Sequence, residues 1–190
     1  MSRITFLSIA IVSLFAASAG AALVDVPLPG LLGSYPVSET IASRTVSFQL
    51  PAPPSVIHSV SFRISGTQTL GAITCEWGGP YDWPMQFSPE MYDAPHGYWT
   101  ADTTPSVASG PFTVTATFTT SFPNTTWAFL LDGRAEVTLY GSPAGLVDLC
   151  FDNPVPPRGE ITEAVVIVDG DFPIAVATST WGRIKALYRP

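Results

Sequence analysis

The sequence predicts an all-β protein, an antiparallel β-sandwich that is jelly-roll-like or immunoglobulin-like, and three observations support this prediction. Apolar and polar residues alternate with period two in several short segments, as in strands that bury one face. The 19 prolines and 15 glycines interrupt the chain at short intervals, which favours short strands over long helices. No segment has the apolar spacing of a long amphipathic helix. About nine or ten short strands are expected, a number typical of a sandwich.

The N-terminus has the pattern of a secretory signal peptide. Arg3 precedes an apolar run at residues 4–17, and small residues follow at 18–22. This order of a basic, an apolar and a small-residue region predicts a signal helix removed after Ala19, Ala21 or Ala22. The alternative is an uncleaved membrane anchor, but a spanning helix needs about 20 apolar residues. We therefore expect a secreted protein, extracellular or periplasmic, with no membrane span in the mature chain.

The predicted organisation is a single folded domain behind the signal peptide. Residues 1–22 are assigned to the signal peptide, 23–40 to an extended N-terminal lead rich in proline and glycine, and 41–190 to the sandwich domain. Hydrophobic residues make up 46% of the chain, which is enough for a core, whereas charged residues make up only 12%. Eight basic residues against 15 acidic ones argue against a nucleic-acid partner, because phosphate contacts need a basic surplus.

Strand positions follow from the alternation. In residues 112–119, phenylalanine, valine and alanine alternate with threonine, which predicts a half-buried antiparallel strand. The continuous apolar run 164–168 predicts a central strand covered on both faces. Asp132-Gly133 predicts a two-residue hairpin turn. Other strands are expected at 46–50, 59–65, 70–77, 126–131, 134–140, 146–151, 174–178 and 183–188.

Cys75 and Cys150 are the two cysteines of the chain. An exported protein meets oxidising conditions, so an even number of cysteines predicts a disulfide between them. The alternative is a pair of buried thiols. A zinc site is not expected, because the sequence has no C-x-x-C motif and neither histidine lies near a cysteine.

The segment Glu76–Trp99 is the strongest candidate for a ligand site. It holds seven aromatic and four acidic residues, one histidine, and no lysine or arginine, and its prolines predict a long irregular loop. Aromatic rings stack on the apolar faces of sugars, while carboxylates accept hydrogen bonds from hydroxyls. The alternative is a hydrophobic cluster covering one end of the sandwich. The predicted ligand-binding residues are Trp77, Tyr81, Trp83, Tyr92 and Trp99.

Signals for catalysis and for metal binding are weak. The sequence contains none of the common nucleophile, zinc-protease, nucleotide-binding or EF-hand motifs. His58 shares the apolar parity of its strand and is expected toward the core or near the strand start, whereas His96 lies in a turn-rich stretch. Glu163 is expected at the solvent edge of a strand, the alternative being a buried acid with a raised pKa. No cofactor is expected.

Two further patterns concern ion binding and glycosylation. Asp169-Gly170-Asp171 offers oxygen atoms to calcium, but a complete site needs six to eight oxygens, and the same residues favour a turn. Asn124-Thr-Thr matches a glycosylation sequon, which matters only in a eukaryotic secretory pathway.

Three functions are compatible with the sequence. The first is a secreted, non-catalytic binding module whose partner is an extracellular glycan. The second is a structural or adhesive envelope protein whose partner is a surface protein. The third is a small glycoside hydrolase, which would need two carboxylates in one cleft. Exposure of the rings separates the first two, because a sugar platform needs at least two of the five predicted rings to face solvent and lie roughly coplanar, and burial of all five would exclude it.

Overall fold

The computed structural model describes residues 19–36, 42–75, 78–93, 97–105, 108–121, 126–143 and 152–173. All strand pairs in these residues are antiparallel, and the two helical elements are short 3-10 turns. The all-β, antiparallel class predicted from the alternation is therefore confirmed. In the described ranges no helix is long and apolar enough to cross a membrane.

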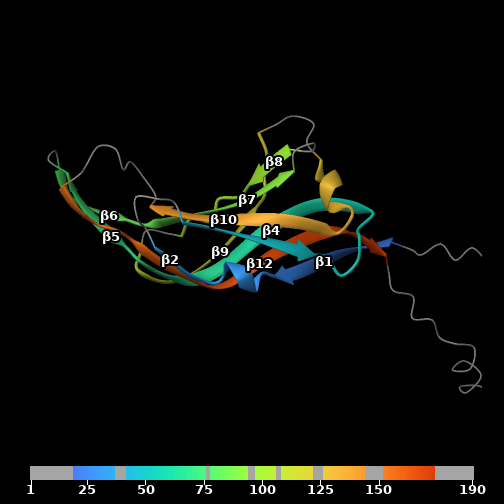
Figure 1. Cartoon of the computed structure of the whole chain (residues 1–190), viewed down its shortest axis with the longest axis horizontal. Helices are drawn as coiled ribbons and strands as arrows, with labels where there is room; N and C mark the ends of the chain where they lie inside the picture. The colour runs from blue at the N-terminus through green and yellow to red at the C-terminus, as the bar shows by residue number, and fades with distance from the viewer. Residues whose placement is uncertain are drawn as a thin grey trace, which may run out of the picture.

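The first sheet has its strands in the order β1, β12, β4, β9, and β2 also pairs with β12. Its long members are β4 (Val56–Thr69) and β12 (Arg158–Pro173). They are joined by β1 (Ala19–Pro27), β2 (Gly33–Pro36) and β9 (Gly110–Thr117). In Figure 1, β4, β9, β12 and β1 form the lower layer.

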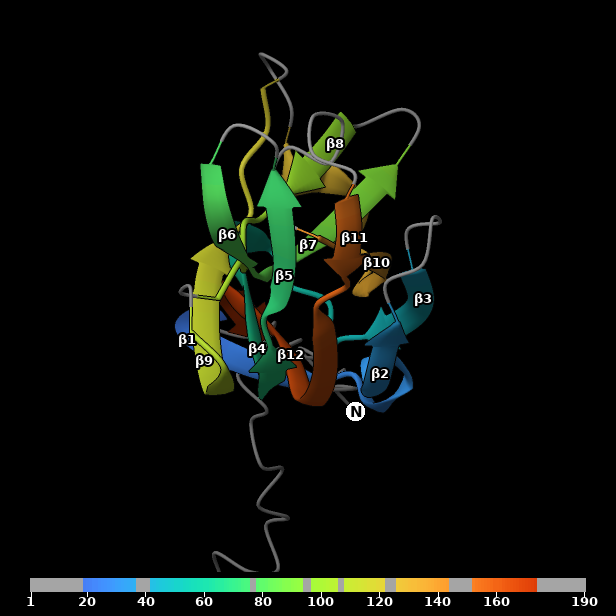
Figure 2. The same ribbon diagram turned by 90° about the vertical axis from the view of Figure 1, so that its left-hand side faces the viewer.

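The second sheet has its strands in the order β3, β10, β7, β8. These strands are β3 (Ala42–Gln49), β10 (Arg134–Pro143), β7 (Met85–Asp93) and β8 (Gly97–Thr100). The third sheet consists of β11 (Asp152–Val155), β5 (Gly71–Cys75) and β6 (Gly78–Trp83). In the chain, β5 comes directly after β4, and β11 comes directly before β12. Figure 2 shows this third sheet at the end of the molecule that faces the viewer.

The first two sheets share one hydrophobic core. Phe62 and Ile64 of β4 face inward from the first sheet, while Val137 and Leu139 of β10 face inward from the second. All four side chains are fully buried, and burial of apolar area is the main stabilising term in such a layer. The period-two prediction is confirmed in these strands and in β9, where threonine is exposed at every second position.

β12 is a central strand, as predicted for residues 164–168. It pairs with β4 on one side and with β1 and β2 on the other. Ala164, Val166 and Val168 belong to the core, and Val165 on the opposite face is buried as well. A strand with neighbours on both sides and cover on both faces carries a continuous apolar run.

The described part of the N-terminal lead lies within the folded sheets. Residues 23–27 complete β1, η1 (Pro29–Leu31) follows, and β2 pairs with the start of β12. Leu28, Leu31 and Tyr35 are buried in the core. Of the expected signal segment, residues 1–18 lie outside the described residues, and residues 19–22 are the first part of β1.

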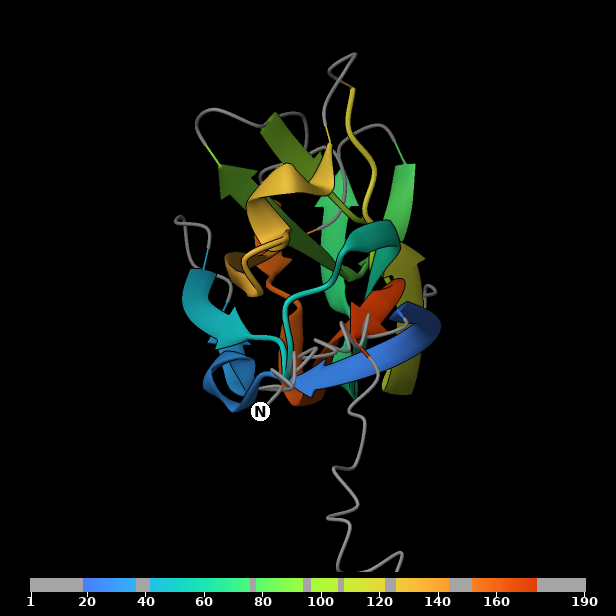
Figure 3. The same ribbon diagram turned by 90° about the vertical axis from the view of Figure 1, so that its right-hand side faces the viewer.

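The prediction of a strand at 126–131 is wrong. Residues Trp127–Leu130 form the 3-10 helix η2, the gold coil in Figure 3. Gly133 has a φ of 81° and donates its amide hydrogen to Leu130 O at 2.9 Å. Asp132-Gly133 therefore ends a helical turn before β10 and does not join two strands. Glycine suits this position because it adopts a positive φ without strain.

The prediction of a long irregular loop at 76–99 is also wrong, since β6, β7 and β8 occupy most of it. The prolines lie where a strand tolerates them. Pro80 is in β6, which pairs with β5 alone among the described strands. Pro89 in β7 lacks an amide hydrogen, but its carbonyl accepts one from Ala101 N at 3.1 Å. Proline is compatible with a strand wherever the ladder requires no amide donor.

Several predictions lie outside the described residues. These are the strands at 146–151, 174–178 and 183–188, the sequon at Asn124, the imidazole of His96, and the disulfide, because Cys150 and the side chain of Cys75 are not described. The strand expected at 70–77 is confirmed over Gly71–Cys75.

Candidate functional site

The outer face of the second sheet carries tyrosines and carboxylates. In β7, Phe87 and Met91 are buried in the core, so the intervening Glu90 and the following Tyr92 point outward. The same alternation turns Tyr98 of β8 outward, next to the buried Trp99. We call the outward set Glu90, Tyr92, Tyr98, Glu136 and Tyr140 the tyrosine face.

Tyr92 and Tyr98 form the exposed centre of this face. They are directly opposite each other in the β7–β8 pair, their ring centroids are 6.5 Å apart, and the ring planes are inclined by 60°. Tyr92 is 69% exposed. The exposed ring of Tyr92 can therefore contact a flat apolar ligand face.

Tyr98 is held in its protonated form by its surroundings. Burial, a side-chain hydrogen bond with Glu90 and the negative charge of Glu90 raise the pKa of Tyr98 to about 12. The phenol therefore donates its hydrogen to the carboxylate of Glu90 at neutral pH. A carboxylate has about four acceptor positions, so Glu90 keeps acceptor capacity for a ligand hydroxyl.

Hydroxyl groups extend the face toward β3. Glu136 of β10 accepts a hydrogen bond from Ser47 Oγ at 2.8 Å, and the Thr45 and Thr138 hydroxyls are hydrogen bonded at 2.8 Å. Thr138 is in register with Glu90 across the β10–β7 pair. Polar groups thus run from β3 across β10 to the tyrosines.

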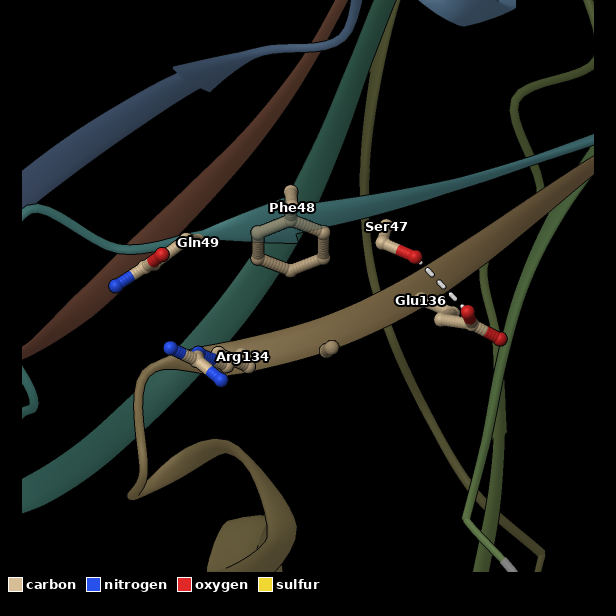
Figure 4. A pocket seen from close by; sticks show the side chains of 6 residues that line it. Ser47, Phe48, Gln49, Arg134 and Glu136 are labelled. Atoms are coloured by element: carbon tan, nitrogen blue, oxygen red, sulfur yellow. Dashed lines mark hydrogen bonds between the residues drawn. The ribbon is translucent and has the colours of Figure 1, made fainter.

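A shallow pocket of about 480 Å³ lies where β3 and β10 pair. Figure 4 shows the hydrogen-bonded Ser47 and Glu136 at one end and Gln49 with Arg134 at the other. Phe48 and Ala135 supply the apolar part of the lining. The pocket thus combines a hydrogen-bond donor, an acceptor and an apolar patch, as small polar ligands require.

The structure separates the ring residues that the sequence grouped together. Trp83 is buried, and Trp99 is 3% exposed. Trp99 packs against Trp127 at 4.8 Å and against Phe129 at 4.9 Å between ring centroids, as in the alternative of a hydrophobic cluster. Among the predicted rings whose side chains the structure describes, Tyr92 alone is exposed, so these residues do not supply the pair of exposed, coplanar rings that the prediction required. Trp77 and the side chain of Tyr81 lie outside the described residues.

Four residues of the face, Glu90, Tyr98, Glu136 and Tyr140, were missed as site residues. Tyr98 and Glu90 lie inside the aromatic segment, and their parity with Tyr92 and Thr100 was the available signal. Tyr140 lies on β10, far away in sequence, and contributes to the raised pKa of Tyr98. Its place beside β7 follows from strand pairing, which single-sequence alternation does not give.

Glu163 is bound into an ion-pair network on the first sheet. Its Oε1 lies 3.4 Å from Arg63 Nη2, and its Oε2 accepts a hydrogen bond from Ser65 Oγ at 2.8 Å. Arg63 also pairs with Asp25 at 3.2 Å. The Glu163 side chain is 45% exposed, which agrees with the expected solvent-edge position.

His58 lies near the start of β4 but does not face the core. The β4–β12 register shifts at this point, from Asp169 opposite Ser59 to Gly170 opposite Ile57. The bulge turns the exposed His58 outward, where its Nε2 lies 3.3 Å from Asp171 Oδ1. A bulge reverses the parity on which the core-facing expectation rested.

Asp169-Gly170-Asp171 lies within β12 and forms no turn. Among the residues that the structure describes, no group of three or more histidine, cysteine, aspartate or glutamate side chains is placed to hold a metal ion.

Comparison with known protein families, curated proteins and solved structures finds no match to this chain.

Proposed function

We propose that this protein is a secreted, non-catalytic β-sandwich that binds extracellular carbohydrate through the tyrosine face. The observation that carries the proposal is the exposed Tyr92 ring opposite Tyr98, with Glu90 bonded beside them. The core shared by the first two sheets supports a sandwich fold, either jelly-roll-like or immunoglobulin-like.

The chemistry of a neutral sugar matches the groups on this face. One side of a pyranose carries axial hydrogens and is apolar, so it stacks on an open phenol ring. The equatorial hydroxyls at the ring edge are donors, and Glu90 and Glu136 are acceptors. The net charge of −7 disfavours acidic sugars, because like charges repel.

A glycan array of the mature protein tests this proposal. We expect neutral glycans to bind, and we expect Tyr92→Ala and Glu90→Gln to weaken binding by about tenfold or more, as removal of a central contact often does. Thr67→Ala, an exposed position on the other sheet, is the control and leaves binding unchanged. Tyrosine and tryptophan fluorescence gives a second readout.

Two results decide against the carbohydrate proposal. One is the absence of any glycan bound above background. The other is binding that persists when both Tyr92 and Tyr98 are replaced by alanine in a folded protein. Either result moves the assignment to the second candidate, a structural or adhesive surface protein.

Export from the cell is part of the proposal, and the register of β1 bears on where the signal peptide ends. β1 pairs with β12 from Ala19 opposite Pro173 to Pro27 opposite Val165. Cleavage after Ala22 would remove residues 19–22 from this nine-residue strand, whereas cleavage after Ala19 retains Gly20–Pro27. We therefore propose cleavage after Ala19.

Intact-mass measurement of the exported protein tests the cleavage position. The expected mature N-terminus is Gly20. A mature chain starting at Leu23 would contradict cleavage after Ala19 and would show that β12 keeps its fold without the first part of β1. A cell-associated protein of full length would contradict export itself.

A further inference from the structure

β9 is a terminal strand of the first sheet. It pairs with β4 on one side, and in the described part of the chain no strand pairs with its other side. Figures 2 and 3 both show β9 at the margin of the molecule. The outward backbone amides and carbonyls of such a strand form a template for a further strand.

The inward side chains of β9 are incompletely covered. Phe62 and Ile64 of β4 are fully buried, whereas Phe112, Val114 and Ala116 of β9, on the same inward face, are only half-buried. The burial of inward side chains therefore falls sharply from β4 to the neighbouring β9. A strand added beside β9 would extend the core and cover these three side chains.

β9 also differs from the other terminal strands in charge. Residues 103–131 contain no charged side chain, whereas β1, β3, β6 and β11 each carry a charged residue within their bounds: Asp25, Arg44, Asp82 and Asp152. Charges at an edge oppose pairing with another chain. β9 lacks this protection over its full length.

The short strands β2 and β8 are also uncharged, but both have further backbone contacts. Ser34 O of β2 accepts a hydrogen bond from Arg44 Nη2 at 3.1 Å. Thr100 of β8 exchanges two backbone hydrogen bonds with Thr119, at 2.8 and 2.9 Å. β9 is thus the long uncharged margin of the described fold.

We infer that β9 is a docking edge for β9 of a second copy of this chain. The copies pair antiparallel about a two-fold axis, which joins the two first sheets into one continuous sheet. Thr113, Thr115 and Thr117 are exposed on one face, and they meet the same row of the partner, where threonine pairs are favourable. Because the pairing edge is uncharged, it brings two acidic chains together without placing like charges opposite each other.

The test compares two single substitutions in the full mature chain. Thr115→Glu adds a carboxylate to the β9 row, directly opposite Arg63 of its own chain, so the fold retains a matching charge. Thr45→Glu places the same charge on β3 of the other sheet and serves as the matched control. Light scattering after size-exclusion chromatography measures the mass, and circular dichroism verifies folding.

We expect the wild type and Thr45→Glu to form dimers and Thr115→Glu to be a monomer. A second measurement is hydrogen exchange of the β9 amides, which should slow as the concentration of the wild type rises. Three results would overturn the inference. The first is a wild type that stays monomeric at high micromolar concentration, and the second is a dimer that survives Thr115→Glu. The third is equal protection of the β9 amides at every concentration, which would mean that the chain covers its own edge.

Discussion

The outer faces of the two main sheets differ in what their polar groups contact. On the first sheet, the Arg63 guanidinium lies 3.2 Å from Asp25 and 3.4 Å from Glu163. Glu163 in turn bonds Ser65, and Ser65 bonds Thr113. Arg63, Asp25 and Glu163 are therefore paired with one another within the protein.

On the second sheet the polar groups include an exposed ring and carboxylates with open acceptor positions. Tyr92 is mostly exposed, and Tyr98 uses its hydroxyl to orient Glu90. Two sheets of the same protein thus use similar residue types differently. A closed network stabilises the fold, whereas an open ring beside an oriented acid is available to a ligand.

The largest expected effect is on stability and concerns Trp99, directly behind the tyrosine face. Trp99→Ala removes a buried ring that contacts two other aromatic rings, so we expect the free energy of unfolding to fall by about 3–5 kcal/mol. Urea denaturation measures this, with Thr100→Ala as the control at the neighbouring outward position. Nearly unchanged stability together with lost glycan binding would place Trp99 in the ligand site instead.

A smaller effect is expected at alkaline pH. The pKa of Tyr98 is raised from 10.0 to about 12 in the folded protein, so the folded state holds this proton more tightly than the unfolded chain. The resulting stabilisation is complete below pH 10 and is lost as the pH rises to about 12.

Replacing Tyr98 by phenylalanine reduces this alkaline loss of stability, as measured by thermal unfolding between pH 9 and pH 12. The loss does not vanish, because burial raises the pKa of Tyr35 to about 12 as well, despite the nearby Arg44. Identical alkaline profiles for the wild type and Tyr98→Phe would show that folding does not raise the pKa of Tyr98.

The smallest effect is expected on the first sheet. Arg63→Ala removes two partly exposed ion pairs, and such pairs contribute up to about 1 kcal/mol. We expect a loss of stability in that range at low salt, a smaller loss at high salt, and unchanged glycan binding. Thr67→Ala, an exposed uncharged position on the same strand, is the control. Impaired glycan binding in Arg63→Ala would contradict the distinction between the two faces.

The sequence was sufficient for elements whose side chains alternate locally. Val114 and Thr115 differ in environment because the pleat turns them to opposite faces, and that information is contained in neighbouring residues. The turn at Gly133 was located but was assigned to a hairpin. An Asp-Gly pair can follow a strand or a 3-10 turn, and here the packing of Trp127 decides between them.

The candidate site depended on pairings that local pattern does not encode. Trp99 is buried because Trp127 and Phe129 cover it, and both come from a later segment. Tyr140 joins the tyrosine face because β10 pairs with β7 in one particular register. Pro89 suggested irregular structure because proline has no amide hydrogen. That β7 nevertheless forms a strand at Pro89, whose carbonyl accepts a hydrogen bond from Ala101 N, is not visible in the local sequence. Exposure of a ring is thus a property of the assembled sheets.

β12 comes after β1, β2 and β4 in the chain, and this order has a consequence for how the molecule is assembled. β1, β2 and β4 all pair with it, so the first sheet remains without its middle strand until residues 158–173 are synthesised. Contacts between such distant segments form slowly. Until β12 is available, the backbone edges of β1, β2 and β4 that pair with it stay open.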